Sequence, residues 1–284
     1  MTKAAVLGSP ISHSLSPTIH ESAYRFLGWD WTYERHLVES GGLARFLTSH
    51  QGEFRGLSLT MPLKEEALAL LDSLTEMAKR TNSANTIVFD ELGSHGFNTD
   101  VQGFRDALSF HKVAIPSEVV ILGGGATARS AVAAVDGLAK VIKVYVRSER
   151  RGKALVNAAL SSIVSIMDWQ ELSDGEFGVG PQLIISTTPH GATDHLVPNS
   201  TEGVFFESLY HPWPTPLLNR WRSAGGKVID GLDLLLWQAI GQLEVMSLAG
   251  ALSKSDGSRV NKEELSLHMR TDAVKILDSR SMSK

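Results

Sequence analysis

The chain has 284 residues, of which 43% are hydrophobic and 20% charged, so it is an ordinary globular sequence long enough for one large or two modest domains. Its 27 basic and 31 acidic residues give a net charge of −4, and without a dense stripe of Lys and Arg it is not expected to bind nucleic acid. The absence of cysteine excludes disulfides, thiolate metal sites and a thiol nucleophile.

The first third of the chain alternates short apolar runs with longer segments of helical spacing. This pattern is typical of an α/β fold, in which parallel strands are joined by crossover helices. We predict strands over residues 3–7, 31–36, 56–59 and 86–89, and helices over residues 17–27, 43–50 and 64–71.

The same alternation continues through the rest of the chain. We predict strands over residues 118–122, 141–146, 182–186, 204–207 and 227–229, a small-residue helix over 126–138 and a long helix over 232–248. Asn261 is the predicted N-cap of a closing amphipathic helix that carries Leu265, Met269, Ala273 and Ile276. Composition and spacing change around residues 98–102 and at Gly225-Gly226, which are the candidate hinges.

No segment has the character of a membrane anchor or a targeting signal. The apolar stretch at the start is short and is broken by Gly8 and Pro10. The longest apolar runs elsewhere, such as residues 234–237, fall far below the roughly 20 residues of a membrane-spanning helix. The sequence therefore predicts a soluble, cytoplasmic protein with no membrane partner.

A glycine-rich turn between a predicted strand and a predicted helix is the strongest local signal. In Gly123-x-Gly125-x-x-Ala128, the first glycine allows a tight turn, the second lets the backbone approach a pyrophosphate, and Ala128 allows close packing of helix on strand. The N–H groups at the helix start would face the phosphates. A plain tight turn is the alternative interpretation.

The segment after the next strand indicates which dinucleotide would bind. An acidic residue there would accept a hydrogen bond from the ribose 2′-hydroxyl of NAD, whereas an arginine accommodates the 2′-phosphate of NADP. Here the strand is followed by Arg147, Ser148 and Glu149, and then by Arg150 and Arg151. Because guanidinium groups pair with phosphate, the sequence favours NADP over NAD. A solvated basic strand end is the alternative.

Two further turns carry candidate substrate-binding groups. Residues 8–17 contain four serines and His13, and hydroxyls spaced two apart, as in Ser14 and Ser16, can converge on one carboxylate or cap the following helix. Lys64 lies just past another predicted strand, at the end where open α/β sheets bind ligands. A single lysine at such a place is more often solvated.

These turns belong to a larger ordered set of motifs. The others are Ser83-Ala84-Asn85-Thr86, Asn98-Thr99-Asp100-x-x-Gly103, Glu207-x-x-Tyr210-x-Pro212-x-x-Thr215-Pro216-Leu217 and the segment 231–239. In this order and spacing, the chain resembles the shikimate dehydrogenase family from about Val6 to Leu248. The resemblance implies the reversible reduction of 3-dehydroshikimate to shikimate by NADPH, a step of aromatic amino-acid biosynthesis.

The resemblance also implies a role for each matching residue. Lys64 and Asp100 would form the catalytic pair, because hydride addition to a carbonyl creates an alkoxide that needs a proton. The substrate carboxylate would lie at Ser14 and Ser16, and its ring hydroxyls at Thr60, Asn85, Tyr210 and Gln238. The cofactor-binding residues would be Gly123, Gly125, Ala126, Arg129, Arg147, Ser148, Arg150, Thr187, Gly231 and Leu234.

We predict two α/β domains with mainly parallel sheets. Residues 1–103 with 229–284 would form the substrate-binding domain, and residues 104–228 a Rossmann-type NADP-binding domain. The expected partner is a small-molecule substrate, with no metal, no nucleic acid and no membrane, in a monomer or homodimer. His13, His20, His190 and His211 lack the spacing of a helical metal pair and are expected to be structural or exposed.

Some positions depart from the family pattern. Ser58, Glu21, Ser186 and Val146 replace Asn, Glu207 replaces Asp, and Leu234 replaces a frequent Met. Two alternatives remain open. A quinate/shikimate dehydrogenase using NAD or NADP commonly has Thr in place of the second serine, so Ser16 and Arg147 argue against it. Retention of Lys64 and Asp100 argues against a non-catalytic NADP-binding sensor.

Overall fold

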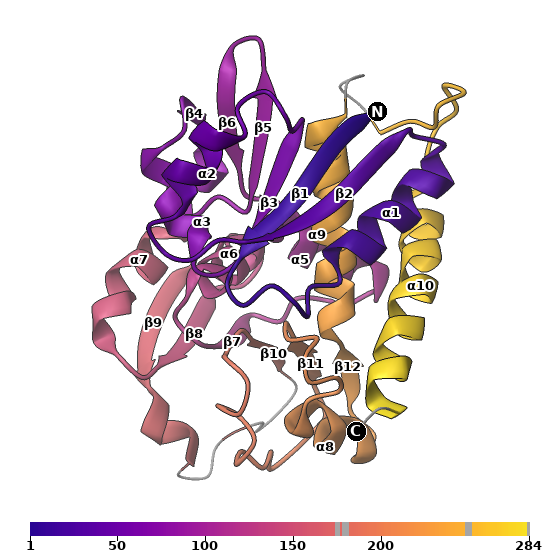
Figure 1. The fold of residues 1–284 in the computed structure, drawn as a ribbon. Coiled ribbons are helices and arrows are strands. Elements are labelled where there is room, and N and C mark those ends of the chain that lie inside the picture. The colour runs from indigo at the N-terminus through magenta and orange to yellow at the C-terminus, as the bar shows by residue number, and fades with distance from the viewer. Residues whose placement is uncertain (174–176, 178–181, 248–251, 283–284) are drawn as a thin grey trace. The chain divides into compact units, whose positions relative to one another are not determined.

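The computed structural model describes residues 1–173, 177, 182–247 and 252–282 (Figure 1). The chain divides into two compact units. The first unit contains Met1–Thr99 and Leu236–Lys284, and the second contains Asp100–Leu235. The chain thus passes between the units at residues 99–100 and 235–236. The predicted domain boundaries lie at residues 103–104 and 228–229. The Gly225-Gly226 turn, a predicted hinge, lies inside the second unit.

The first unit is built on a six-stranded sheet of order β2-β1-β3-β5-β6-β4. Its strands are β1 (Thr2–Gly8), β2 (Trp31–Leu37), β3 (Gly56–Leu59), β4 (Ser73–Leu74), β5 (Thr86–Asp90) and β6 (Gly93–Phe97). The prediction of parallel strands is confirmed for β1, which pairs with β2 and β3. β5 is antiparallel to both β3 and β6, which the prediction of mainly parallel sheets allows. Only residues 91–92 join β5 to β6, which is enough for a hairpin and too short for a crossover.

Helices and apolar side chains cover this first sheet. The helices are α1 (Ser16–Leu27), α2 (Leu43–Ser49), α3 (Leu63–Glu66), α4 (Glu76–Arg80) and α10 (Lys262–Met282). The helix predicted over 64–71 is therefore shorter, since a 3₁₀ turn at Ala67–Ala69 follows α3. Leu7, Leu57 and Ile87 from the strands form one buried cluster with Phe46 of α2.

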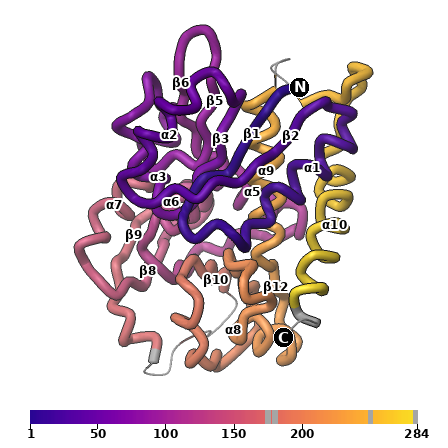
Figure 2. Tube along the Cα trace, in the orientation of Figure 1, coloured from indigo at the N-terminus to yellow at the C-terminus, as the bar shows by residue number. Residues whose placement is uncertain are grey.

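The predicted closing helix is confirmed as α10. Asn261 caps it, because its Oδ1 accepts hydrogen bonds from the backbone N–H of Glu263 (2.9 Å) and of Glu264 (3.3 Å). Its buried apolar residues are Leu265, Met269, Ala273 and Leu277, one per turn, whereas Ile276, predicted for this face, is half-buried. Figure 1 and Figure 2 show α10 beside α1, to which it is joined by a hydrogen bond from Ser22 Oγ to Asp272 Oδ2 of 2.9 Å.

The second unit holds a parallel six-stranded sheet of order β12-β11-β10-β7-β8-β9. The strands are β7 (Glu118–Leu122), β8 (Val141–Val146), β9 (Ile163–Asp168), β10 (Leu183–Ser186), β11 (Val204–Glu207) and β12 (Lys227–Ile229). Numbered within the unit and read from β9, the order is 3-2-1-4-5-6, which is the Rossmann arrangement. The α/β class and the Rossmann-type sheet were both predicted.

The helices of the second unit are α5 (Asp100–Phe110), α6 (Ala126–Val135), α7 (Gly152–Asn157), α8 (Pro216–Ser223) and the first turn of α9 (Gly231–Met246). Short 3₁₀ turns lie at Glu149–Arg151 and Trp169–Ser173. Phe205 of β11 stacks on Trp221 of α8 with ring centroids 5.5 Å apart, inside the core of this unit. Among the helices that the structure describes, none has the length and apolar character needed to span a bilayer.

Candidate active site

One edge of the first sheet collects most of the predicted substrate-binding residues. The carboxyl ends of β1 and β3 adjoin, since Leu7 pairs with Leu59, and the antiparallel β5 begins at the same edge, with Ser58 opposite Thr86. The turns that follow β1 and β3 lie against each other, because a Cβ atom added at Gly8 would lie only 2.3 Å from Thr60 Cγ2. The segments that carry Ser14 and Ser16, Thr60 and Lys64, and Asn85 therefore begin or end side by side.

The serine turn leads directly into α1. Ser14 and Ser16 are buried, and the Ser14 hydroxyl accepts a 3.2 Å hydrogen bond from the backbone N–H of Ser16. The hydroxyl that accepts here keeps its own proton for donation to an anion. From outside the turn, Arg35 Nη1 donates to the carbonyl of Ser12 (2.6 Å) and Arg280 Nη1 to that of His13 (3.0 Å). The turn is thus held by β2 and by the last turns of α10.

Lys64 lies in α3, and its main chain is fixed on two sides. Its carbonyl accepts a 2.8 Å hydrogen bond from the N–H of Ala84, the residue before Asn85. Two residues along, the Glu66 carboxylate accepts from the N–H groups of Gly41 (2.8 Å) and Leu43 (2.9 Å). The Lys64 side chain is half-buried. A lysine held this way has a defined starting point for its long side chain at the sheet edge.

Asn85 and Gln238 are brought together, as the resemblance implied. The side chain of Asn85 is buried; its Nδ2 donates to Thr99 Oγ1 (2.9 Å) and to Gln238 Oε1 (3.4 Å). Its Oδ1 accepts from the N–H of Thr99 (2.9 Å) and from Thr86 Oγ1 (2.9 Å). These bonds set the amide in one orientation, with its donor and acceptor roles assigned.

Gln242, which was not predicted, supports Asn85 through buried hydrogen bonds. It lies one turn after Gln238 on α9, and its Nε2 donates to Thr86 Oγ1 (3.1 Å) and to the carbonyl of Asn85 (3.3 Å). Its Oε1 accepts from Ser58 Oγ (2.9 Å), which in turn accepts from the Tyr33 hydroxyl (2.6 Å). The spacing of four residues from Gln238 was the available signal, because it places both amides on one helix face.

Asp100 and Tyr210 belong to the second unit, whereas Lys64 belongs to the first. Asp100 is the first residue of α5, directly after Thr99 in the chain, and its side chain is buried. Tyr210 is half-buried in the segment between β11 and α8.

The glycine turn has the backbone geometry that a dinucleotide site requires. Gly123 follows β7 with φ +114°, and a Cβ there would lie 2.6 Å from Thr187 Oγ1 after β10. β7 and β10 are neighbours at the point where the strand order reverses, which is where open α/β sheets bind ligands. Gly125 precedes α6 without a side-chain cap, so N–H groups at the helix start are available to an anion. Ala128 and Arg129 are buried.

The basic segment after β8 also lies at this end of the sheet. Arg147, Ser148 and Arg150 are exposed. Arg151, a member of the basic segment that is not among the predicted cofactor-binding residues, reaches the glycine turn. A Cβ added at Gly124 would lie 3.2 Å from Arg151 Cδ, and one added at Gly125 would lie 3.7 Å from Arg151 Nη1. The turn and its surroundings fit a phosphate-bearing dinucleotide. Within the described parts of the chain, no group of three or more His, Cys, Asp or Glu could hold a metal.

His20 supports the serine turn from within the core. Its ring is buried and stacks on Tyr33 (4.0 Å between centroids), and its Nδ1 donates to the Ser16 carbonyl (2.9 Å). Burial lowers the pKa of His20 from 6.5 to about 4. The ring is therefore neutral at physiological pH, which fits the structural role expected for this histidine.

The depressed pKa of His20 predicts loss of stability in acid. The unfolded chain takes up a proton near pH 6.5, while the folded chain resists protonation down to about pH 4. His20 should therefore reduce the free energy of unfolding as pH falls through this window, by about 3 kcal/mol in total. Urea unfolding of wild type and His20→Gln at pH 7, 6 and 5 measures this, with the exposed His190→Gln as control. Equal acid sensitivity in His20→Gln and wild type would contradict the assignment.

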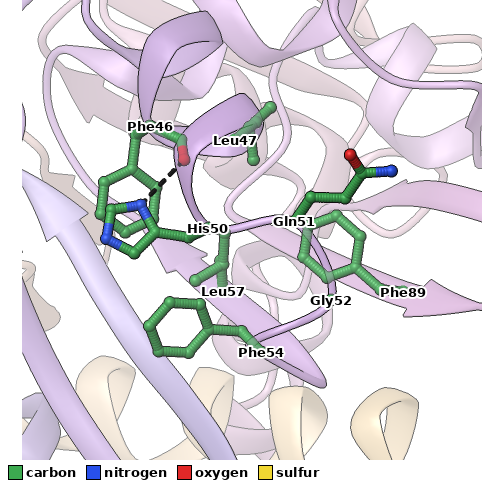
Figure 3. A pocket seen from close by; sticks show the side chains of 8 residues that line it. All are labelled: Phe46, Leu47, His50, Gln51, Gly52, Phe54, Leu57 and Phe89. Carbon is green, nitrogen blue, oxygen red and sulfur yellow. Dashed lines mark hydrogen bonds between the residues drawn. The ribbon is translucent and has the colours of Figure 1, made fainter.

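A separate apolar cavity of about 60 Å³ lies in the first unit and contains none of the predicted site residues (Figure 3). Phe54, Leu57 and Phe89 contribute to its wall, and His50 stacks on Phe46 while its Nδ1 donates to the Phe46 carbonyl (3.0 Å). Ligand sites combine apolar walls with converging polar groups. Since the imidazole is already engaged with α2, we assign no ligand to this cavity.

Comparisons with known proteins find relatives of this chain both in sequence and in fold. Residues 6–87 match the family model described as the shikimate dehydrogenase substrate binding domain. The shikimate dehydrogenase (NADP(+)) of Desulfitobacterium hafniense is 31% identical over 247 residues, covering 84% of this chain and 90% of that protein. The crystal structure of Mycobacterium tuberculosis shikimate dehydrogenase has 33% identity and a TM-score of 0.81, covering 95% of this chain and 99% of that one. The Thermus thermophilus enzyme solved with NADP(H) and shikimate has 28% identity and a TM-score of 0.76, covering 96% and 100%.

Proposed function

The chain belongs to the shikimate dehydrogenase family, and we propose from this membership that it is an oxidoreductase that interconverts 3-dehydroshikimate and shikimate with NADP. The observation that supports the proposal is that the segments carrying Ser14 and Ser16, Thr60 and Lys64, and Asn85 meet at one end of the first sheet, where Asn85 is hydrogen-bonded to Gln238. A ring bearing one carboxylate and several hydroxyls needs this combination of hydroxyl, amide and amine groups around it.

The substrate is held through its polar substituents. Ser14 and Ser16 donate their hydroxyl protons to the carboxylate, which the neighbouring start of α1 also favours. Thr60, Asn85, Gln238 and, from the second unit, Tyr210 bind the ring hydroxyls. Because the Asn85 amide is fixed by Thr99 and Thr86, its orientation is set before the ring binds.

Lys64 and Asp100 handle the proton of the reaction. NADPH, when bound, supplies a hydride to the carbonyl carbon of 3-dehydroshikimate. Lys64 donates a proton to the oxygen on which negative charge develops, and in the reverse direction takes it from the shikimate hydroxyl. Asp100 orients the Lys64 ammonium. A site closed to bulk water strengthens both interactions and protects the hydride from side reactions.

The cofactor is held by the second unit. Gly123 and Gly125 let the backbone approach the pyrophosphate, with Ala126 and Arg129 at the start of α6 and Thr187 beside the turn. Arg147, Ser148 and Arg150 bind the 2′-phosphate of the adenosine ribose, while Gly231 and Leu234 lie on the nicotinamide side. We propose that residues 1–103 with 229–284 bind the substrate and that 104–228 bind the cofactor, to which the start of α9 adds Gly231 and Leu234.

Replacing Arg147 with glutamine should raise KM for NADP about tenfold and leave KM for NAD nearly unchanged, because a charge-assisted hydrogen bond to phosphate contributes roughly 1.5–3 kcal/mol and solvent at this exposed site weakens it. Arg222→Gln removes an exposed arginine of the same unit and should behave like wild type. Steady-state kinetics with each cofactor measure the ratio. An unchanged preference for NADP in Arg147→Gln would show that another side chain reads the 2′-phosphate.

An assay of shikimate and quinate, each with NADP and NAD, tests the proposed function. We expect reduction of NADP with shikimate to be the fastest combination. A preference for quinate with NAD would favour a quinate/shikimate dehydrogenase, and no turnover with any combination would favour a non-catalytic NADP-binding sensor. We further propose that the protein is cytoplasmic, acts as a monomer or homodimer, and binds neither nucleic acid nor membranes.

A further inference from the structure

The path of the segment that carries Tyr210 is set by a buried carboxylate. Glu207, the last residue of β11, is fully buried and lies opposite Ser186 of β10 in the sheet register. Its two oxygens accept from the two ends of the segment 208–215. The N–H of Leu209 donates to Oε1 (3.1 Å), and Thr215 Oγ1 donates to Oε2 (3.2 Å). One side chain therefore ties both ends of the segment to the strand.

The bond from Thr215 also connects Glu207 to α8. Thr215 Oγ1 accepts a 3.3 Å hydrogen bond from the N–H of Leu218 and so caps that helix. A hydroxyl that accepts from the helix while it donates to the carboxylate has both roles assigned. Glu207, the Thr215 cap and the start of α8 thus form one connected chain of hydrogen bonds.

On its other side the segment contacts Gly231, the first residue of α9. A Cβ at this position would lie 2.2 Å from the Leu209 carbonyl oxygen and 2.7 Å from the Tyr210 nitrogen. Both neighbours are backbone atoms, so they cannot move away as the end of a flexible side chain could. Leu209 and Tyr210 are therefore confined between the Glu207 carboxyl group and a position where only glycine fits.

Burying the carboxyl group of Glu207 costs desolvation free energy. Burial raises the pKa of Glu207 to about 7 despite its hydrogen bonds. An apolar residue of similar size would fill the volume without the desolvation cost, but it would leave the Leu209 N–H and the Thr215 hydroxyl without their acceptor. The benefit that offsets the cost is a single geometry for the segment.

We propose that Glu207 and Gly231 are positioning residues that set the location of Tyr210 for binding the substrate ring. The inference rests on the proposed function, in which Tyr210 contacts that ring. Glu207 does not itself touch substrate or cofactor; it acts through Leu209 and Thr215. This gives a role to Glu207, a position where the chain departs from the family pattern.

Four variants test the proposal: Glu207→Gln, Thr215→Val, Thr215→Ser and Gly231→Ala. Glutamine keeps the shape of Glu207 but offers one acceptor instead of two, and Thr215→Val removes a donor at nearly constant volume. Thr215→Ser restores the donor. Glu202→Gln, at an exposed position of the same unit, is the matched control.

The first readout is amide hydrogen exchange across residues 208–215, which does not depend on activity. We expect exchange at least about tenfold faster in Glu207→Gln, Thr215→Val and Gly231→Ala, since one lost hydrogen bond corresponds to about a factor of ten. Thr215→Ser and the control should match wild type. Wild-type exchange in Glu207→Gln and Thr215→Val would overturn the proposal.

The second readout is steady-state kinetics. We expect KM for shikimate to rise about tenfold in Glu207→Gln and Thr215→Val, with KM for NADP unchanged and Thr215→Ser near wild type. Faster exchange without any change in KM for shikimate would also overturn the proposal, since the segment would then not place a substrate contact. Failure of the wild type to turn over shikimate would instead refute the proposed function, and the exchange experiment would remain informative about the segment.

Discussion

Replacing Lys64 with glutamine is expected to lower kcat by about 10²–10⁴-fold, the usual contribution of a positioned general acid or base. Glutamine preserves much of the volume of the lysine side chain but cannot exchange a proton with the substrate oxygen. The main chain of residue 64 keeps its bond from Ala84, so the sheet edge should stay intact. Because the glycine turn is built from the second unit, KM for NADP should remain near the wild-type value.

Two further variants distinguish proton donation by Lys64 from the effect of its positive charge. Lys64→Arg retains a positive charge but has no proton to give at neutral pH, so we expect it to be nearly as inactive as Lys64→Gln. Lys79→Gln removes an exposed lysine of α4, paired with Glu76 at 2.8 Å, and should leave kcat unchanged. Substantial activity in Lys64→Arg would mean that this position supplies charge stabilisation only.

Replacing Asp100 with asparagine should lower kcat by about 10²-fold or more, because the lysine loses the carboxylate that orients it. The substitution keeps the size of a buried side chain at the start of α5. If the two residues act as a unit, the double variant Lys64→Gln/Asp100→Asn should be no slower than the slower single variant.

Asp106→Asn provides the matched control for Asp100. Asp106 lies on the same helix and accepts from Gln102 Nε2 (2.7 Å), so its replacement changes the charge of α5 without touching the proposed pair. Its kcat should equal that of wild type. A loss of kcat in the double variant that equals the product of the losses in the two single variants would indicate two independent substrate contacts in place of a catalytic pair.

Most of the strands that were predicted from the sequence are buried, although the partly exposed edge strands β2 and β12 were predicted as well. β7 and β10, in the middle of the second sheet, consist almost wholly of buried apolar residues, and such runs are visible without any partner. β9 is an edge strand with partly exposed residues, and β6 contains two glycines and little apolar character. β6 forms because β5 pairs with it and because His95 Nδ1 bonds Ser73 Oγ at 2.7 Å.

Strand direction was beyond what a periodic pattern contains. Residues in a parallel and an antiparallel strand alternate faces in the same way, so the sequence pattern of β5 does not differ from that of the parallel strands β1 and β3. The helix α8 was missed for a different reason. Thr215 and Pro216 carry the cap and first-turn signals of a helix, but they were considered only as part of the motif that contains Tyr210, and no helix was predicted there.

In the candidate site, too, residues of local motifs could be predicted, whereas contacts between distant segments could not. The serine turn and the glycine turn are local motifs, so their residues could be named in advance. Gln242, Arg151 and the contact of Gly231 with Leu209 depend on segments that are distant in the chain and meet only in the fold. Gln242 and the Gly231 contact became apparent only through hydrogen bonds and close approaches, whereas Arg151 already belonged to the predicted basic segment and only its approach to the glycine turn is new.

The division of the chain has a consequence for how the protein emerges during synthesis. The second unit is one uninterrupted stretch, whereas the first is assembled from both ends of the chain. When the ribosome has released residue 235, the inserted unit is complete, but Arg55 still lacks the Met246 carbonyl to which its Nε donates, and Ser22 lacks Asp272. The usual N-terminal-first order of cotranslational folding is therefore reversed. The second unit can fold completely before the first unit, which cannot be completed until α10 has been synthesised.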